Sequence, residues 1–275
     1  MDPRRTEGMN GGGGVDRDGD ARRTGSTRRT EMLGEMGIGP VWRLRAAEQA
    51  APAAALSPEA ALVAREPAAP LPQTAAGGDG AVEQLNWPAL KARVASCMAC
   101  ALHEKRNKTV FGVGDEHAGW LFVGEGPGAE EDEQGEPFVG QAGKLLDNML
   151  AAIDLKRGVN VYIANIVKCR PPGNRTPHAD EAQVCSSYLQ RQIALIQPKL
   201  IVALGKVAAV SLLGRDASIA SLRGQLHAYR GIPLIVTYHP AYLLRTLPDK
   251  AKAWQDLCFA VETMRRLQTA QPAAI

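Results

Sequence analysis

Four cysteines constrain this chain more than any other feature of its sequence. Cys97 and Cys100 form a C-x-x-C pair, and Cys169 and Cys185 follow far downstream. Two thiolates on one turn and two on distant segments can converge on one metal centre, and four thiolates suit either zinc or an iron–sulfur cluster. A zinc ribbon normally carries two C-x-x-C knuckles, whereas fifteen residues separate the second pair here. The spacing alone leaves both kinds of centre open.

The fifth cysteine and the absence of long apolar runs give expectations about the compartment. Cys258 has no cysteine neighbour and lies in an apolar segment, so we expect a buried core thiol. Five cysteines without a signal peptide indicate a reducing compartment, in which metal ligation is commoner than disulfide bonds. No apolar run reaches the ~18 residues of a membrane span, so we expect no membrane partner.

Residues 1–80 differ in composition from the rest of the chain. They are rich in Gly, Arg, Asp, Ala and Pro and have few aromatic residues, so they cannot bury enough apolar surface to offset the entropy of ordering. We predict a disordered, low-complexity tail and linker there, with one apolar island at 32–45 that could dock as a short helix. A single ordered domain is predicted over residues 81–270.

Four short apolar runs rich in Val, Ile and Leu predict buried strands, at 120–124, 161–165, 200–205 and 233–238. They lack polar alternation, which is typical of a parallel sheet covered on both faces. Helical segments alternate with them, at 85–95, 143–155, 177–197 (with Thr176 as its N-cap), 206–214 and 250–268. The sequence therefore predicts an α/β protein, a three-layer α/β/α sandwich with a four-stranded, mostly parallel sheet.

Each of the first two predicted strands ends in a candidate binding motif, at the sheet edge where such folds bind ligands. GEGPG (124–128) does not have the spacing of a dinucleotide fingerprint, and the acidic residues after it would repel a pyrophosphate. It either presents backbone N–H groups to a heterocycle or forms only a tight turn. Asn165 ends the second strand and either reads the N–H and C=O of a pyrimidine edge or caps a loop.

Aromatic, imidazole and apolar side chains accompany these two motifs. Phe138, in a loop between glycines, either stacks on a flat ring or plugs the loop. A neutral His239, after the fourth strand, can donate a hydrogen bond to an oxygen that gains negative charge, or it is structural. Leu243, Leu244 and Arg245 suit an apolar wedge beside a cation in a DNA duplex, or they begin a core helix.

Net charge is weakly informative, since it is only +3. Five basic residues lie in or beside predicted loops around the motifs, where either nucleic acid or a solvated surface explains them: Lys168, Arg170, Arg175, Arg223 and Arg245.

Three segments carry a resemblance to a known family. GEGPGAEEDEQGEPFVGQAGKLLDNML, NIVKCRPPGNRTP and HPAYLLR resemble the signature regions of the family 4 uracil-DNA glycosylases, the iron–sulfur members of that superfamily. The resemblance covers about residues 83–268 and includes four of the cysteines. It implies a [4Fe–4S] cluster on Cys97, Cys100, Cys169 and Cys185. It implies contacts to uracil from Gly124, Glu125, Gly126, Phe138, Asn165 and His239. From their positions in the motifs and loops, we expect contacts to DNA from Arg175, Leu243, Leu244 and Arg245.

The resemblance implies a DNA repair glycosylase that flips uracil out of DNA and hydrolyses its N-glycosidic bond, leaving an abasic site. His239 would act on the leaving oxygen and Asn165 on the base edge. The water-positioning aspartate of the best-known family in the superfamily is replaced by Gly126, which leaves Glu125, Glu130 and Glu131 as candidates for handling the water. A relative that stays covalently attached to its DNA carries a basic, histidine-bearing insertion that this chain lacks.

The expected partner is uracil-containing DNA, single- or double-stranded, and the expected enzyme is a monomer in the bacterial cytoplasm, at the nucleoid when it acts. The alternative is a non-catalytic DNA-binding, polymerase-associated accessory protein on the same iron–sulfur scaffold.

Overall fold

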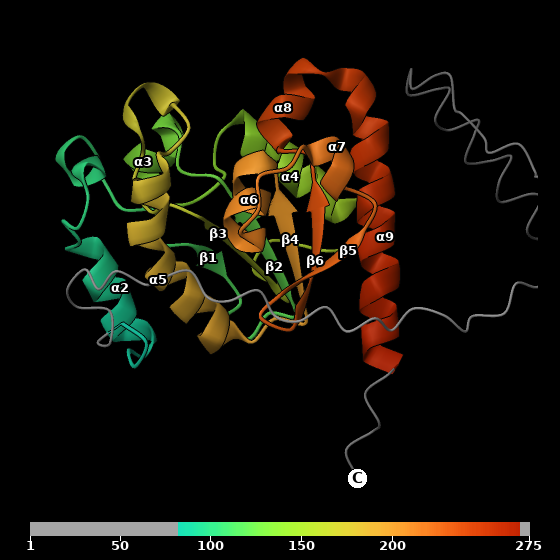
Figure 1. The fold of residues 1–275 in the computed structure, drawn as a ribbon, viewed down its shortest axis with the longest axis horizontal. Coiled ribbons are helices and arrows are strands. Elements are labelled where there is room, and N and C mark those ends of the chain that lie inside the picture. Colours follow the sequence, from blue (N-terminus) through green and yellow to red (C-terminus); the bar gives the residue numbers. More distant parts are fainter. Residues whose placement is uncertain (1–81, 270–275) are drawn as a thin grey trace, which may run out of the picture. The chain divides into compact units, whose positions relative to one another are not determined.

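The structure, a computed structural model, describes residues 82–269, which lie within one compact unit of the chain (Figure 1). The tail predicted at 1–80 and its apolar island at 32–45 lie outside the described residues. Within the described part, no helix combines the length and the apolar composition needed to cross a bilayer.

Six strands form one sheet, in the order β1-β3-β2-β4-β6-β5. The four central strands run parallel and match the four predicted runs: β2 (Trp120–Gly124), β3 (Val161–Asn165), β4 (Leu200–Leu204) and β6 (Ile232–Thr237). Antiparallel edge strands complete the sheet, β1 (Val113–Gly114) and β5 (Leu226–Tyr229). The prediction of four strands is therefore wrong in number, because β1 is two residues long and β5 is an exposed edge without an apolar run.

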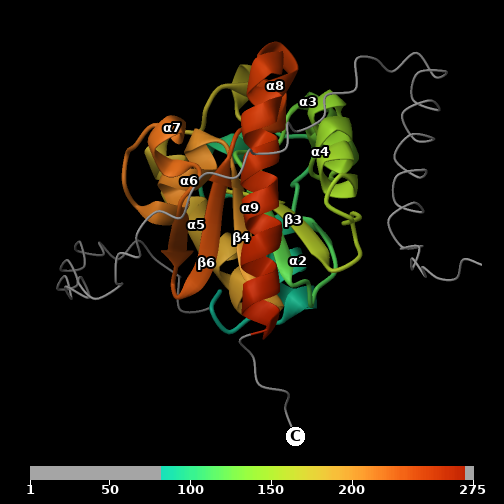
Figure 2. The same ribbon diagram turned by 90° about the vertical axis from the view of Figure 1, so that its right-hand side faces the viewer.

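The central strands are buried because helices cover both faces of the sheet. Side chains of β2 alternate between two separate core clusters: Leu121 and Val123 enter one, and Trp120 and Phe122 enter the other. The first cluster is closed by α2, α5, α6 and α7, and the second by α4 and α9 (Figure 1 and Figure 2). The predicted three-layer α/β/α architecture is thereby confirmed.

Helices and short 3-10 turns connect the strands, with these bounds: α2 (Trp87–Ala95), η2 (Ala101–Glu104), α3 (Ala129–Gln134), α4 (Gln141–Ala151), η3 (Pro172–Asn174), α5 (Ala179–Ile196), α6 (Lys206–Leu213), α7 (Ile219–Leu222), α8 (Pro240–Arg245), η4 (Leu247–Asp249) and α9 (Lys250–Thr269). The N-cap of α5 is His178 rather than Thr176, because the Glu181 carboxylate accepts a hydrogen bond from His178 N at 2.8 Å and fixes the first turn there.

The prediction that Cys258 is a buried thiol is wrong. The buried face of α9 carries Ala253, Leu257 and Ala260, whereas Cys258 is exposed. It lies one turn after Trp254, which is also exposed, so both face away from the sheet.

Candidate active site and cysteine cluster

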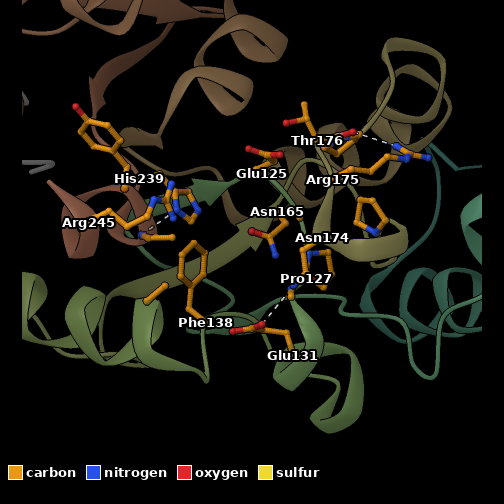
Figure 3. Close-up of a pocket in the computed structure, with 17 residues that line it drawn as sticks. Glu125, Pro127, Glu131, Phe138, Asn165, Asn174, Arg175, Thr176, His239 and Arg245 are labelled. Carbon is orange, nitrogen blue, oxygen red and sulfur yellow. Dashed lines mark hydrogen bonds between the residues drawn. The ribbon is translucent and has the colours of Figure 1, made fainter.

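A cavity of about 530 Å³ opens at the carboxyl ends of the central strands. Its volume lies in the range of small-molecule sites. The sequence-predicted residues that line it are Glu125, Gly126, Glu131, Phe138, Asn165, Arg175, His239 and Arg245. Figure 3 shows the side chains of Phe138, Asn165 and His239 converging on a common space from three separate segments of the chain.

Asn165 is the last residue of β3 and is 2% exposed. Its Oδ1 atom has no hydrogen-bond partner among the described residues. A buried oxygen without a donor is unfavourable by about 1–3 kcal/mol, so such an atom in a cavity indicates that a ligand supplies the N–H. Gly124, the register partner of Asn165 on β2, leaves the space open, because a Cβ there would lie 2.5 Å from Oδ1.

His239 is the N-cap of α8, and its Nδ1 atom accepts a hydrogen bond from Ala241 N at 3.2 Å. A neutral imidazole that accepts at Nδ1 carries its proton on Nε2, which is then free to donate. Burial, reinforced by the charge of Arg245 and opposed by that of Glu131, lowers the pKa of His239 to about 4. The ring is therefore neutral near pH 7, and its Nε2–H can donate a hydrogen bond.

Phe138 has a φ of 55°, in the left-handed region that residues with side chains seldom adopt. Its ring lies 5.5 Å from the imidazole of His239, centroid to centroid, with 30° between the planes. The side chain is buried and packs in the same core cluster as Phe122 and Leu146. Phe138 therefore lines the cavity and also belongs to the core, and its stacking on a flat ring stays a prediction.

The three acidic candidates differ in their surroundings. Glu125 lines the cavity, and burial raises the pKa of its carboxyl, partly offset by the Thr176 hydroxyl. Glu131 is engaged with the backbone: Oε2 accepts from Gly128 N at 3.0 Å, and Oε1 accepts from Val139 N at 3.0 Å. Glu130 is exposed and does not line the cavity. Of these three carboxylates, Glu125 lines the cavity without accepting the backbone hydrogen bonds that occupy Glu131.

The four predicted cysteine ligands line a second, smaller pocket. Cys97 and Cys100 follow α2, Cys169 lies in the loop after β3, and Cys185 lies on α5. Hydrogen-bond donors reach their sulfurs: Arg106 Nη1 donates to Cys169 Sγ at 3.1 Å, and Lys168 N donates to Cys185 Sγ at 3.3 Å. Burial raises the pKa of the Cys185 thiol to about 12, against the opposing effect of Lys168.

Comparison with protein families matches residues 111–258 to the uracil DNA glycosylase superfamily. The chain belongs to this superfamily. It is 41% identical over 172 residues to a type-4 uracil-DNA glycosylase of Pyrobaculum aerophilum, across 60% of this chain and 87% of the relative. It is 47% identical over 162 residues to that of Thermotoga maritima, across 58% and 84%. It is 44% identical over 159 residues to that of Archaeoglobus fulgidus, across 55% and 79%. The resemblance to family 4 is thereby confirmed.

Within this uracil-DNA glycosylase fold, four thiols from three segments of the chain line the cysteine pocket. Four thiolates are the donor set that ligates an iron–sulfur cluster, and they also suit a structural zinc ion.

Lys168, next to Cys169 in the sequence, is a buried cation in the glycosylase fold. The reading of this residue as a solvated loop cation is wrong, since it is 1% exposed. Its Nζ atom donates to Gln192 Oε1 at 2.6 Å and to the Asn165 carbonyl at 3.0 Å. Burial lowers its pKa to about 8. These two oxygen acceptors take the place of solvent around the buried ammonium group.

The predicted DNA contacts of this glycosylase divide into exposed, paired and buried residues. Leu244 is 42% exposed and Arg245 is exposed beside the cavity. Arg175 donates to both carboxylate oxygens of Glu181, at 2.8 and 2.7 Å, so its charge is already paired. Leu243 is 1% exposed and packs against Met149 and Leu257, so the prediction that it contacts DNA is wrong.

Proposed function

We propose that the protein is a DNA repair glycosylase that removes uracil from DNA by hydrolysing the N-glycosidic bond, leaving an abasic site. One observation carries the proposal: the partnerless oxygen of Asn165 lies in the same cavity as a neutral His239 and the ring of Phe138. A base inside a duplex cannot reach such a cavity, so the nucleotide must be flipped out of the stack.

Asn165 supplies the recognition of the base. Uracil presents an N3–H beside a carbonyl, which matches an amide that accepts at Oδ1 and donates at Nδ2. Cytosine presents an unprotonated N3 beside an amino group, so both contacts would be mismatched. Sites built on buried hydrogen bonds reject such analogues by about 10⁴–10⁵ in kcat/KM.

His239 supplies the stabilisation of the leaving group. As the C1′–N1 bond breaks, its electron pair passes to uracil and negative charge develops on O2. The Nε2–H group of His239 donates a hydrogen bond to that oxygen. Because burial lowers the pKa of His239 to about 4, the ring is neutral when it makes this hydrogen bond. One such donor is typically responsible for ~10²–10³ in rate.

Water completes the reaction at the sugar. The oxocarbenium-like C1′ accepts the water oxygen as the new bond forms. The proton that this oxygen loses passes to a carboxylate, and the balance is completed when the departing uracil anion is protonated at N1. Glu125 is the carboxylate that we assign to hold this water, because it lines the cavity and Glu131 is committed to backbone amides. The products are free uracil and an abasic site.

We assign the [4Fe–4S] cluster to Cys97, Cys100, Cys169 and Cys185. When bound, such a cluster supplies a covalent link between the segment after α2, the loop after β3 and α5. Hydrolysis of an N-glycosidic bond moves no electrons to a carrier, so the proposed role of these four cysteines is structural.

The proposed partner is uracil-containing DNA, with Leu244 as the wedge and Arg245 beside it. Because every residue of the proposed reaction comes from residues 81–270 of one chain, we propose that this segment is the catalytic domain and that it acts as a monomer. Because the proposed substrate is DNA, we propose that the enzyme acts at the nucleoid in the bacterial cytoplasm.

The test is a uracil-release assay on oligonucleotides that carry a single U, C or T, as single strands and as duplexes. We expect free uracil and an alkali-labile abasic site from the U oligonucleotides, and no product from C or T. DNA binding without base release would instead support the non-catalytic accessory protein.

A further inference from the structure

Phe138 adopts a backbone conformation that its own chemistry disfavours. A φ of 55° suits glycine or asparagine and is an outlier for a bulky aromatic residue. Such conformations persist only where the surrounding structure imposes them. The contacts that hold Phe138 therefore decide where its ring lies in the cavity.

One guanidinium group holds the carbonyl groups of this loop. Arg157 Nη1 donates to the Pro137 carbonyl and Nη2 donates to the Phe138 carbonyl, both at 2.8 Å. The rigid fork of an arginine matches two oxygens that point the same way, which a lysine cannot do. Arg157 lies in the loop between α4 and β3, and its side chain is 23% exposed.

The guanidinium group is itself anchored to the fold. Asp147 Oδ1, on α4, accepts a hydrogen bond from Arg157 Nε at 3.0 Å and forms an ion pair with Nη2 at 3.0 Å. Gly143, also on α4, has no room for a side chain, because a Cβ there would lie within bonding range of the Phe138 carbonyl oxygen. On the other side of the loop, Glu131 accepts from the next two backbone amides. The loop is held through its carbonyls by Arg157 and through its amides by Glu131.

We propose that Arg157 is a positioning residue for base excision, which acts by fixing Phe138 against His239. The inference rests on the proposed function and extends it to a residue that does not line the cavity. With the carbonyls of Pro137 and Phe138 held, the ring stays 5.5 Å from the imidazole before any base arrives. The flipped base then binds against a Phe138 ring that is already in place, so binding does not have to order the ring.

A double-mutant cycle separates positioning from general stabilisation. Single-turnover uracil release is measured for wild type, Arg157→Ala, Phe138→Ala and the double variant. We expect Arg157→Ala to lose about 10- to 100-fold, the scale of a misplaced group. The double variant should be no slower than Phe138→Ala, because Arg157 has nothing left to position.

Two matched variants control for charge. Arg157→Lys keeps the charge and loses the fork, so its rate should resemble that of Arg157→Ala. Arg266→Ala removes one exposed cation from α9, which pairs with Glu262, and should keep the wild-type rate. Affinity for abasic-product DNA should stay unchanged in Arg157→Lys, whereas inhibition by free uracil should weaken.

A readout that needs no activity is the ¹⁹F spectrum of protein labelled at phenylalanine, with the Phe138 signal assigned through Phe138→Leu. Arg157→Lys should move or broaden that signal. If Arg157→Ala does not fold, the same measurements are made on Arg157→Lys and Asp147→Asn.

The inference is overturned if Arg157→Lys keeps the wild-type rate and spectrum. It is also overturned if the rate losses of Arg157→Ala and Phe138→Ala multiply in the double variant. A wild type that releases no uracil, with a Phe138 signal that still depends on Arg157, overturns the proposed function and leaves the positioning of Phe138 supported.

Discussion

Gly124 and Asn165 face each other at the carboxyl ends of the adjacent parallel strands β2 and β3, and a Cβ on Gly124 would lie 2.5 Å from Asn165 Oδ1. The same Cβ would lie 2.6 Å from Phe138 Cζ. The absence of a side chain at this position therefore leaves room for the two groups that we assign to the base.

Gly124→Ala tests this relationship. Both neighbours are buried, so the added methyl group must displace the Asn165 amide, the Phe138 ring or both. We expect single-turnover uracil release to fall about 100-fold, the scale of a misplacement of ~1 Å, with a loss of stability of about 1–3 kcal/mol. Wild-type kinetics in a folded Gly124→Ala variant would show that neither side chain needs its present place.

The pH dependence of excision tests the state of His239. Since burial lowers its pKa to about 4, the ring stays neutral through the usual histidine range. We expect no inflection from His239 near pH 6.5; its inflection in the single-turnover rate should appear as the pH approaches about 4, separate from that of Glu125, whose pKa burial raises. His239→Gln, which has no titrating group at this position, should be slower and should lack the low-pH inflection.

The same pKa has a consequence for stability. Between pH 6.5 and about 4 the unfolded chain binds a proton at His239 more readily than the folded one. Its contribution to the free energy of unfolding is therefore complete above pH ~6.5 and is lost as the pH falls toward 4. Equal slopes of unfolding free energy against pH in wild type and His239→Gln would contradict the lowered pKa.

Two neighbouring leucines on α8 give opposite predictions. Leu243→Ala should destabilise the fold by about 2–5 kcal/mol, because it leaves a cavity between α4 and α9. Leu244→Ala should change stability by no more than ~0.5 kcal/mol. It should slow excision from duplexes more than from single strands, which need no wedge. Thermal unfolding and paired duplex and single-strand assays measure both, and equal slowing on the two substrates would remove Leu244 from the wedge role.

Cys169 and Cys258 form a matched pair for the metal centre. The anaerobically purified protein should be brown and contain iron, and Cys169→Ala should lose colour, iron and thermal stability together. Cys258→Ala should keep all three, because this thiol is exposed and lies outside the cysteine pocket. Colourless wild-type protein with stoichiometric zinc would contradict the cluster.

The central strands were predictable because each is a short apolar run whose residues are buried on both faces of the sheet. The grouping of the motifs at the strand ends was predictable for a second reason, because parallel strands bring their carboxyl ends to one edge of the sheet. The edge strands β1 and β5 carried no such signal. Leu243 and Leu244 are adjacent in sequence, and only the rotation of α8 decides which one is buried.

Long basic side chains were the hardest to place from the sequence. Arg157 binds two backbone carbonyls, and Lys168 binds a carbonyl and a distant glutamine. A contact to a backbone carbonyl produces no pattern in the composition or in the hydrophobic periodicity of the sequence. Gln192 is 24 residues away from Lys168 along the chain. No local pattern therefore distinguishes these cations from solvated ones, and their roles emerged only from the folded chain.

The most direct test of the account replaces one atom of the base-reading amide. Asn165→Asp keeps the shape of the side chain and exchanges its N–H donor for a second acceptor oxygen, so the contact to a uracil carbonyl is lost. Single-turnover excision is measured on U and C oligonucleotides with saturating enzyme, and abasic-product binding serves as the control for folding. We predict a loss of uracil excision of at least 100-fold, the scale of a removed buried donor, together with a reduced preference for U over C. Uracil excision by Asn165→Asp at the wild-type rate would contradict the assignment of this cavity as the uracil site.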